Sequence, residues 1–219
     1  FTSEEDIKNN NICQFGETYP GELTKPGDIK YKDLNGDGKI DDYDKSYVND
    51  GDVPSTYYGF GGDVRWKNFG LGILFQGTAG AHRFLSGSGI NPFTSSSGGG
   101  TLYANITDRW SENDPENTNV FYPRLAWGAK DPSNQNNYQT STWWLRDMSF
   151  LRLKQFTVSY YFPKAWTKNG ILKGGRFYIM GENVLTFSKF KLWDPELNTS
   201  NGISYPNVRT FSLGVNFNI

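Results

Sequence analysis

Apolar and polar residues alternate without a break along the last stretch of the chain. Odd-numbered positions from 211 to 219 are apolar, and even-numbered positions from 210 to 218 are polar or glycine. A period of two residues is typical of a β-strand with one apolar face. The alternation reaches the final residue, and Ser212, Gly214, Phe217 and Ile219 resemble the assembly signal of bacterial outer-membrane proteins. We therefore expect the closing strand of a membrane barrel, with an edge strand of a soluble β protein as the alternative.

Four earlier segments carry the same kind of pattern. They cover residues 56–67, 69–79, 150–162 and 174–187. In the third of them the apolar parity shifts near Gln155, which predicts a β-bulge. These segments run about 10–14 residues, the length that a tilted strand needs to cross a bilayer, whereas about 5–6 residues is usual in soluble sheets.

The connections between these segments alternate in length. Residues 67–68 and 163–173 form short connections, whereas 81–148 and 188–207 form long ones. Membrane barrels have short periplasmic turns and long extracellular loops. With a periplasmic C-terminus, every long segment falls outside and every short one inside. Because bacterial barrels close with at least about eight strands, we expect this chain to be a piece that other strands complete.

Composition narrows the fold class. Hydrophobic residues make up 36% of the chain, the mean hydropathy is −0.63, and no apolar run approaches the roughly 18 residues that a membrane helix needs. A helical membrane protein is therefore excluded, but a barrel is not, because only alternate residues face lipid. Aromatic residues at 16% and 25 glycines favour an all-β chain with long loops.

Charge and reactive side chains exclude further classes. A net charge of −1 argues against a nucleic-acid partner. The single cysteine, Cys13, excludes an internal disulfide framework. The only histidine, His82, has no pattern of nucleophile and base around it, so we predict no catalytic residues and no enzyme.

The sharpest local motif is an acidic loop at residues 33–44. Its oxygen ligands would fall at positions 1, 3, 5, 7, 9 and 12 of a calcium loop: Asp33, Asn35, Asp37, the Lys39 carbonyl, Asp41 and Asp44. Gly38 stands at position 6, where such loops turn sharply. The five carboxylates of this segment would repel one another without a cation, so we expect a structural Ca²⁺. The loop resembles dockerin-type loops, and an acidic turn without metal is the alternative.

Tryptophans in the long loops are candidates for contact with a ligand. Aromatic rings beside Asn, Asp and Arg can stack on sugar rings while their polar neighbours bond hydroxyl groups. The candidates for contact with a substrate or with a lid over the barrel are Trp110, Trp127, Trp143 and Trp144. The alternative is that these rings only pack the loops together.

Several ordered segments carry a family resemblance along almost the whole chain. They are residues 26–41 (PGDIKYKDLNGDGKID), 58–64, 70–77, 144–154, 181–187 and 193–196. Together they resemble SusC/RagA-type TonB-linked outer-membrane proteins. Nothing in the sequence resembles the plug or the TonB box of that family, so the resemblance is to its C-terminal part.

The resemblance implies a fold and an organisation. The fold would be the C-terminal segment of a large, 22-stranded, plugged antiparallel transmembrane β-barrel with long extracellular loops. Residues 1–55 would be an extracellular loop with the calcium segment, 56–80 a hairpin, 81–148 a second extracellular loop, and 149–219 the last three strands. The plug would belong to the remainder of the transporter.

The resemblance also implies a function. The family imports glycans or, in some members, oligopeptides across the bacterial outer membrane, with a SusD-like lipoprotein over the barrel mouth. Energy reaches it through the TonB complex, which would act on the missing N-terminal part. This segment would supply barrel wall and loops facing the substrate or the lid.

Two other classes stay open from the residues alone. A soluble, secreted carbohydrate-binding β-domain with a dockerin-like calcium loop would explain the aromatics and the acidic loop. A hydrolase would need carboxylates placed across a cleft, for which Asp194 with Glu196, or Asp114 with Glu116, are weak candidates.

Overall fold

The chain folds into two compact units. The computed structural model describes residues 1–48, 51–94, 102, 104–167 and 173–219. The first unit contains Phe1–Asn49 and Phe84–Leu145, and the second contains Asp50–Arg83 and Arg146–Ile219. The two stretches that the sequence presents as separate loops therefore belong to one compact unit.

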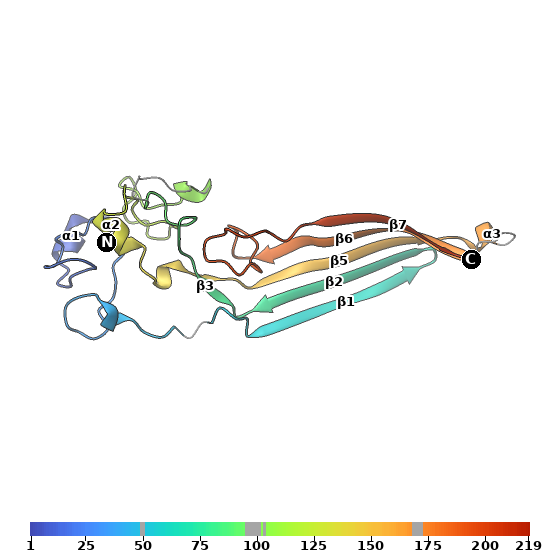
Figure 1. Cartoon of the computed structure of the whole chain (residues 1–219), viewed down its shortest axis with the longest axis horizontal. Coiled ribbons are helices and arrows are strands. Elements are labelled where there is room, and N and C mark those ends of the chain that lie inside the picture. The colour runs from blue at the N-terminus through green and yellow to red at the C-terminus, as the bar shows by residue number, and fades with distance from the viewer. Residues whose placement is uncertain (49–50, 95–101, 103, 168–172) are drawn as a thin grey trace. The chain divides into compact units, whose positions relative to one another are not determined.

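A five-stranded antiparallel sheet makes up most of the second unit (Figure 1). Its order is β1-β2-β5-β6-β7. The strands are β1 (Thr56–Trp66), β2 (Phe69–Ala79), β5 (Phe150–Tyr161), β6 (Gly174–Ser188) and β7 (Thr210–Asn218). All five strands predicted from the alternation are present, and each pairs with its neighbour in chain order. The fold class is confirmed as antiparallel β.

The predicted bulge lies in β5. Against β2, the extra residue is Lys154, because Leu74 pairs with Gln155 and Phe75 with Leu153. The register between β5 and β6 also shifts here, but the extra residue on that side lies in β6, because Leu153 pairs with Leu185 and Gln155 with Glu182. One extra residue in β5 moves the apolar positions from odd to even numbers and keeps them on one face of the sheet.

A tight turn at Lys67 and Asn68 joins β1 to β2. Lys67 has a φ of 54°, in the left-handed region that two-residue hairpin turns require. The Asn68 side chain donates to the Tyr161 carbonyl at 2.7 Å, which anchors the turn to the end of β5. The connection from β5 to β6 begins with the short helix α3 (Lys164–Thr167), and residues 168–172 of this predicted turn lie outside the described part of the chain.

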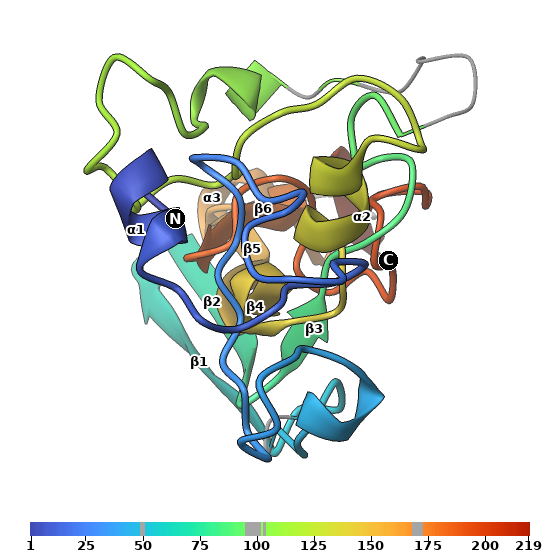
Figure 2. The same cartoon turned by 90° about the vertical axis from the view of Figure 1, so that its left-hand side faces the viewer.

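The first unit consists mostly of irregular loops with short helices (Figure 2). The helical segments are α1 (Glu4–Lys8), η1 (Asp42–Asp44), η2 (Ala104–Thr107), α2 (Pro132–Asn137) and η3 (Thr142–Trp144). Two short strands, β3 (His82–Phe84) and β4 (Leu145–Asp147), pair where the chain passes from one unit to the other. Among the described residues, no helix is long and apolar enough to cross a membrane.

The core of the first unit mixes aliphatic, aromatic and amide side chains. Ile7, Ile29 and Ile40 are buried from its N-terminal stretch. The Trp144 indole packs against Tyr122 and Tyr138 and donates to the Asn137 carbonyl at 2.8 Å. These contacts join α2 to the segments on either side of it.

Candidate functional site: the two faces of the sheet and the acidic loop

One face of the five-stranded sheet is apolar and exposed. The register places large apolar side chains of all five strands on this face, which we call the apolar face. Its members are Tyr58, Phe60, Val64, Trp66, Phe69, Leu71, Ile73, Phe75, Leu151, Leu153, Phe156, Val158, Tyr160, Phe177, Ile179, Leu185, Phe187, Phe211, Leu213, Val215 and Phe217. Leu213 is 82% exposed and Phe60 is 56% exposed. A surface of this size is far larger than the apolar patches that soluble monomers usually present to water.

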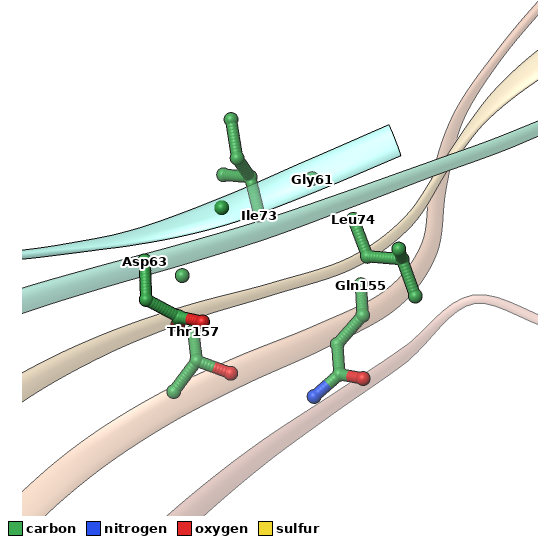
Figure 3. Close-up of a pocket in the computed structure, with 8 residues that line it drawn as sticks. Gly61, Asp63, Ile73, Leu74, Gln155 and Thr157 are labelled. Carbon is green, nitrogen blue, oxygen red and sulfur yellow. The ribbon is translucent and has the colours of Figure 1, made fainter. Parts of the chain in front are cut away.

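The opposite face carries polar and small residues, and we call it the polar face. Asp63, Gln155 and Thr157 point to this side of the sheet, whereas Ile73 points to the other side (Figure 3). These residues line a shallow hollow of about 410 Å³ whose floor includes Gly72. A Cβ atom at Gly72 would lie 2.3 Å from the Asp63 carboxylate, so a larger residue there would displace the Asp63 side chain.

Aromatic rings on the sheet lie over glycines of the neighbouring strand. The Tyr178 ring lies where a side chain of Gly214 would be, with its Cζ atom 2.2 Å from the ideal Cβ position. Such pairs of an aromatic residue with a glycine stabilise strongly twisted sheets, because the ring covers backbone that the glycine leaves bare.

A buried arginine anchors the loop between β6 and β7. Arg152 is 1% exposed and pairs with Asp194, and its Nη1 donates to Glu196 Oε2 at 2.9 Å. Asn207 donates to the same Glu196 oxygen at 2.9 Å, so both ends of the loop meet at one carboxylate. Asp194 and Glu196 are therefore partners of Arg152 and are not placed as the acid and base of a hydrolase. The sequence offered no signal for this ion pair beyond an arginine in an apolar strand.

A buried amide and carboxylate network organises the first unit. Asp28 accepts hydrogen bonds from the Lys25 N–H, the Ser133 hydroxyl and the Asn137 amide, each at 2.9 Å. Asn137 in turn accepts from the Ile29 N–H at 2.8 Å. Burial raises the pKa of Asp28, and the three hydrogen bonds oppose that rise. The network joins the segment around residue 28 to α2 across more than 100 residues of sequence.

The acidic loop has the conformation of an oxygen-lined turn. Asp33 accepts from the Gly36 N–H at 2.6 Å and from the Gly38 N–H at 2.9 Å. Gly38 has a φ of 83°, so the sharp turn predicted at position 6 is present. The Ile40 N–H donates to the Cys13 carbonyl at 2.8 Å, which attaches the loop to the segment around Cys13.

The first and last residues of the loop lie close together. The side chains of Asp33 and Asp44 approach closely enough to interact, and Asp44 accepts from the Leu34 and Asp41 N–H groups at 2.8 Å. These backbone donors lower the pKa of Asp44, which keeps its carboxylate ionised.

Asp37 and Asp41, two of the three remaining carboxylates of the loop, are directed differently. Asp41 pairs with Lys39 Nζ at 3.0 Å, and Asp37 accepts from the Lys39 N–H at 3.1 Å. In the described part of the chain no three acidic, thiol or imidazole groups converge in a metal-binding cluster. The chemistry of the donors nevertheless suits a hard cation, because they are carboxylate, amide and carbonyl oxygens and the Asp33 and Asp44 side chains approach each other.

The four tryptophans differ in exposure. Trp144 and Trp110 are buried, and Trp110 donates through its indole to the Pro115 carbonyl at 3.1 Å. Trp143 donates to the Phe121 carbonyl at 3.1 Å. Trp127 is 68% exposed and packs on Phe93 at 5.0 Å between ring centroids. Of the four, Trp127 therefore has the most surface open for a ligand or partner.

The first unit also contains a larger hollow beside the acidic loop. Its volume is about 700 Å³, and Phe15, Tyr31, Asp41, Asp44 and Tyr47 are among the residues that line it. Burial raises the pKa of Tyr31, whose hydroxyl donates to the Asn136 carbonyl at 2.8 Å. The Tyr31 hydroxyl is therefore neutral, and it lines this hollow as a hydrogen-bonding group.

Comparison with curated proteins identifies relatives along most of the chain. TonB-dependent receptors P3 and P26 of Formosa agariphila are each 32% identical over 87% of the chain. The TonB-dependent receptor SusC of Bacteroides thetaiotaomicron is 29% identical over 94% of it. The chain spans 19% of the length of each of these relatives. No protein-family model matches the chain.

Solved structures show the same fold. The RagAB peptide importer in its closed-closed state superposes with a TM-score of 0.65 at 23% identity, over 84% of this chain and 20% of that one. The RagAB peptide transporter gives a TM-score of 0.62 at 24% identity, over 82% of this chain and 19% of that one. The sheet therefore has the fold of part of a transporter barrel.

Proposed function

Since the chain corresponds to a segment of TonB-dependent receptors of the SusC/RagA type, we propose that it forms wall and outer loops of an outer-membrane importer. The observation that carries this proposal is the exposed apolar face, which extends over all five strands. In water such a face would drive aggregation, whereas in a bilayer it is the ordinary outer surface of a barrel. The polar face then lines the lumen.

The orientation follows from the connections. The short turn at Lys67 and Asn68 and the C-terminus lie at the same end of the antiparallel sheet, which we place in the periplasm. The long connections, and with them the first unit, would lie outside the cell. Their position suits them to meet a substrate and a surface lipoprotein.

The cargo and partners belong to this proposal as well. We place the chain in an importer of glycans or oligopeptides that works with a SusD-like lipoprotein and draws energy through the TonB complex. SusC is named among the relatives, and a peptide importer is named among the structural neighbours. Trp127 is the loop aromatic with most surface for contact with cargo or lipoprotein.

A structural Ca²⁺ in the acidic loop completes the proposal. Asp33, Asn35, Asp37, the Lys39 carbonyl, Asp41 and Asp44 would hold it, and the ion would fix the loop beside the 700 Å³ hollow. Extracellular calcium sites commonly bind in the range of about 10⁻⁴–10⁻³ M. Asp33→Asn and Asp44→Asn should weaken binding measured by terbium luminescence. Asp42→Asn should not, because the exposed Asp42 carboxylate pairs with Lys45. Equal binding by all three variants would contradict the site.

Fractionation of cells that carry the full-length protein tests the membrane assignment. We expect it in the outer membrane, extracted only by detergent, with faster gel migration before boiling than after. Transport is tested by uptake of labelled glycans and labelled oligopeptides with and without the protein. A water-soluble protein would instead support the secreted carbohydrate-binding domain, which the exposed apolar face disfavours.

A further inference from the structure

A hollow lies on the apolar face over strands β5, β6 and β7. Its volume is about 460 Å³, and Phe69, Val158, Phe177 and Val215 are among the residues that line it. Val158 and Val215 are each 42% exposed, whereas Leu213, which also lines the hollow, is 82% exposed. Two short side chains therefore lie between longer ones, and this difference in length produces the hollow.

Aromatic rings border the hollow at the end of the sheet where β1 turns into β2. Phe69 pairs with Tyr160, and Tyr160 pairs with Phe177, so the three rings form one row across the sheet. The ring centres of Phe162 and Phe177 lie 5.0 Å apart. Gly175 leaves room for the first of these rings, because a Cβ atom there would lie 2.6 Å from Phe162 Cε2. The rings support one another, so this border of the hollow has a defined shape.

A cation lies at the same end of the sheet and on the same face. The Lys67 Nζ atom is 4.7 Å from the centre of the Trp66 ring. Trp66 belongs to the apolar face and pairs with Phe69, which lines the hollow. Within the described residues, no carboxylate pairs with Lys67. Lysine and tryptophan side chains together are typical of the level at which lipid head groups meet the acyl chains.

The distance from the ammonium group to the hollow matches the build of a phospholipid. Phe69 is two residues beyond Lys67 in the chain, and Val158 pairs with Leu71, which is four residues beyond it. At about 3.3 Å per residue, the hollow extends from roughly 7 Å to roughly 13 Å along the strands from the turn. In a glycerophospholipid, glycerol joins the phosphate to the acyl chains. A phosphate at Lys67 would therefore place an acyl chain beside the hollow.

We propose that the hollow and Lys67 together bind one glycerophospholipid of the periplasmic leaflet, with an acyl chain in the hollow and the phosphate at the ammonium group. The inference rests on the proposed function, which places the apolar face in the bilayer and this turn in the periplasm. It goes further, because it distinguishes one bound lipid from the lipids that cover the rest of the face. The chemistry identifies the occupant, since an anionic phosphate complements the ammonium and an acyl chain complements the apolar hollow.

Photo-cross-linking with a lipid probe tests the proposal in the full-length protein. The protein is freed of lipid in detergent and given a single equivalent of phosphatidylethanolamine that carries a diazirine in the upper half of one acyl chain. Peptide mapping should find the label concentrated on the peptides that contain Val158 and Leu213. A diacylglycerol probe with the same diazirine lacks the phosphate and should not be concentrated there.

Two variants and two matched controls separate the parts of the site. Lys67→Gln removes the cation, and Val158→Phe fills the hollow, so each should abolish the concentration of label. Ile73→Phe adds a ring on the apolar face outside the residues that line the hollow. Lys191→Gln removes an exposed lysine from the loop after β6. Both control variants should be labelled like the unsubstituted protein.

The other outcomes overturn the proposal. Label spread evenly over the apolar face, no label at the hollow because another protein covers it, or equal labelling by the diacylglycerol probe would each contradict a phospholipid site. Assembly is read separately, from detergent extraction and from the gel shift on boiling. Loss of both properties in the unsubstituted protein would refute the proposed function, whereas an assembled barrel with evenly spread label refutes the lipid site alone.

Discussion

The two units of this chain bury opposite kinds of side chain. In the first unit, isoleucines and aromatic rings are inside, together with Asn136 and Asn137, whose amide groups donate hydrogen bonds to the Ile29 carbonyl and to Asp28. In the sheet of the second unit, Arg152 and Ser159 are buried while Phe60 and Leu213 are exposed. The two units therefore differ in which side chains they expose: the first unit buries its apolar residues, and the sheet exposes them on one face. The first unit is built for water, and the sheet is built for a nonpolar surrounding on one side.

A charge placed on the apolar face is the strongest test of this difference between the two units. Leu213→Arg should destabilise the protein by roughly 2–4 kcal/mol in lipid, the cost of a cation near the bilayer midplane. In water the same substitution would be nearly neutral, because Leu213 is 82% exposed. Urea unfolding of the full-length protein in lipid vesicles measures the effect.

Ser212→Arg is the control for that substitution, since position 212 lies next in sequence and on the polar face. It should change stability little. Equal destabilisation by the two variants would show that the faces do not differ in solvent.

The amide core of the first unit is tested by Asn137→Ala. This change leaves the Ile29 N–H and one Asp28 oxygen without their partners in a buried site. Unsatisfied buried groups cost about 1–3 kcal/mol each, so we expect a loss of that order or slightly more. Hydrogen exchange should show it as lost protection at Ile29 and in α2, with the sheet unchanged. Asn113→Ala, on the exposed surface, should have no such effect.

The loop after β6 is tested by Arg152→Met. Methionine preserves the packing of the long side chain but leaves Asp194 and Glu196 without their cation. Hydrogen bonds to charged groups contribute roughly 1.5–3 kcal/mol, and the partial exposure of Glu196 should keep the loss near the lower end. Limited proteolysis should then cut within residues 189–207. Resistance equal to that of the unsubstituted protein would mean that the ion pair does not hold the loop.

The smallest expected effect is the dependence of the first unit's stability on pH through the ionisation of Asp28. Its folded-state pKa is raised above the ordinary 3.8, so the folded protein binds more protons than the unfolded one in the window just above 3.8. The contribution of Asp28 to stability is therefore complete below that window and declines as the pH rises through the folded pKa. Unfolding of the first unit, followed against pH, should show this slope, and Asp28→Asn should remove it.

The contribution of Asp6 to stability depends on pH in the opposite direction to that of Asp28. Its hydrogen bond with Lys30 lowers its pKa, so its contribution is present above 3.8 and is lost as the pH falls through the lowered value. If Asp28→Asn left the slope above 3.8 unchanged, burial would not govern this carboxyl group.

The sheet was largely predictable from the sequence, and the first unit was not. A period of two is a local signal, so the strands and the parity change near Gln155 could be located from residues close in sequence. The first unit depends on bonds such as that from Asn137 to Asp28, between residues 109 apart, and no local pattern marks such pairs.

The candidate sites divide in the same way. The acidic loop is contiguous, and its turn at Gly38 matched its prediction, while its metal stays a prediction. The ion pairs of Arg152 escaped sequence analysis because its partners, Asp194 and Glu196, lie more than 40 residues further along the chain, in the loop after β6. The tryptophans were chosen by residue type alone, which cannot distinguish buried Trp144 from exposed Trp127.

The central claim is that the apolar face contacts lipid, and spin-label accessibility tests it most directly. In a cysteine-free background that includes Cys13→Ser, single cysteines would replace Leu213 and Val158 on the apolar face and Ser212 and Thr157 on the polar face. With the full-length protein in lipid vesicles, labels at the first two positions should collide mainly with oxygen, and labels at the other two should not. Equal access of a water-soluble nickel complex to all four positions would contradict the account.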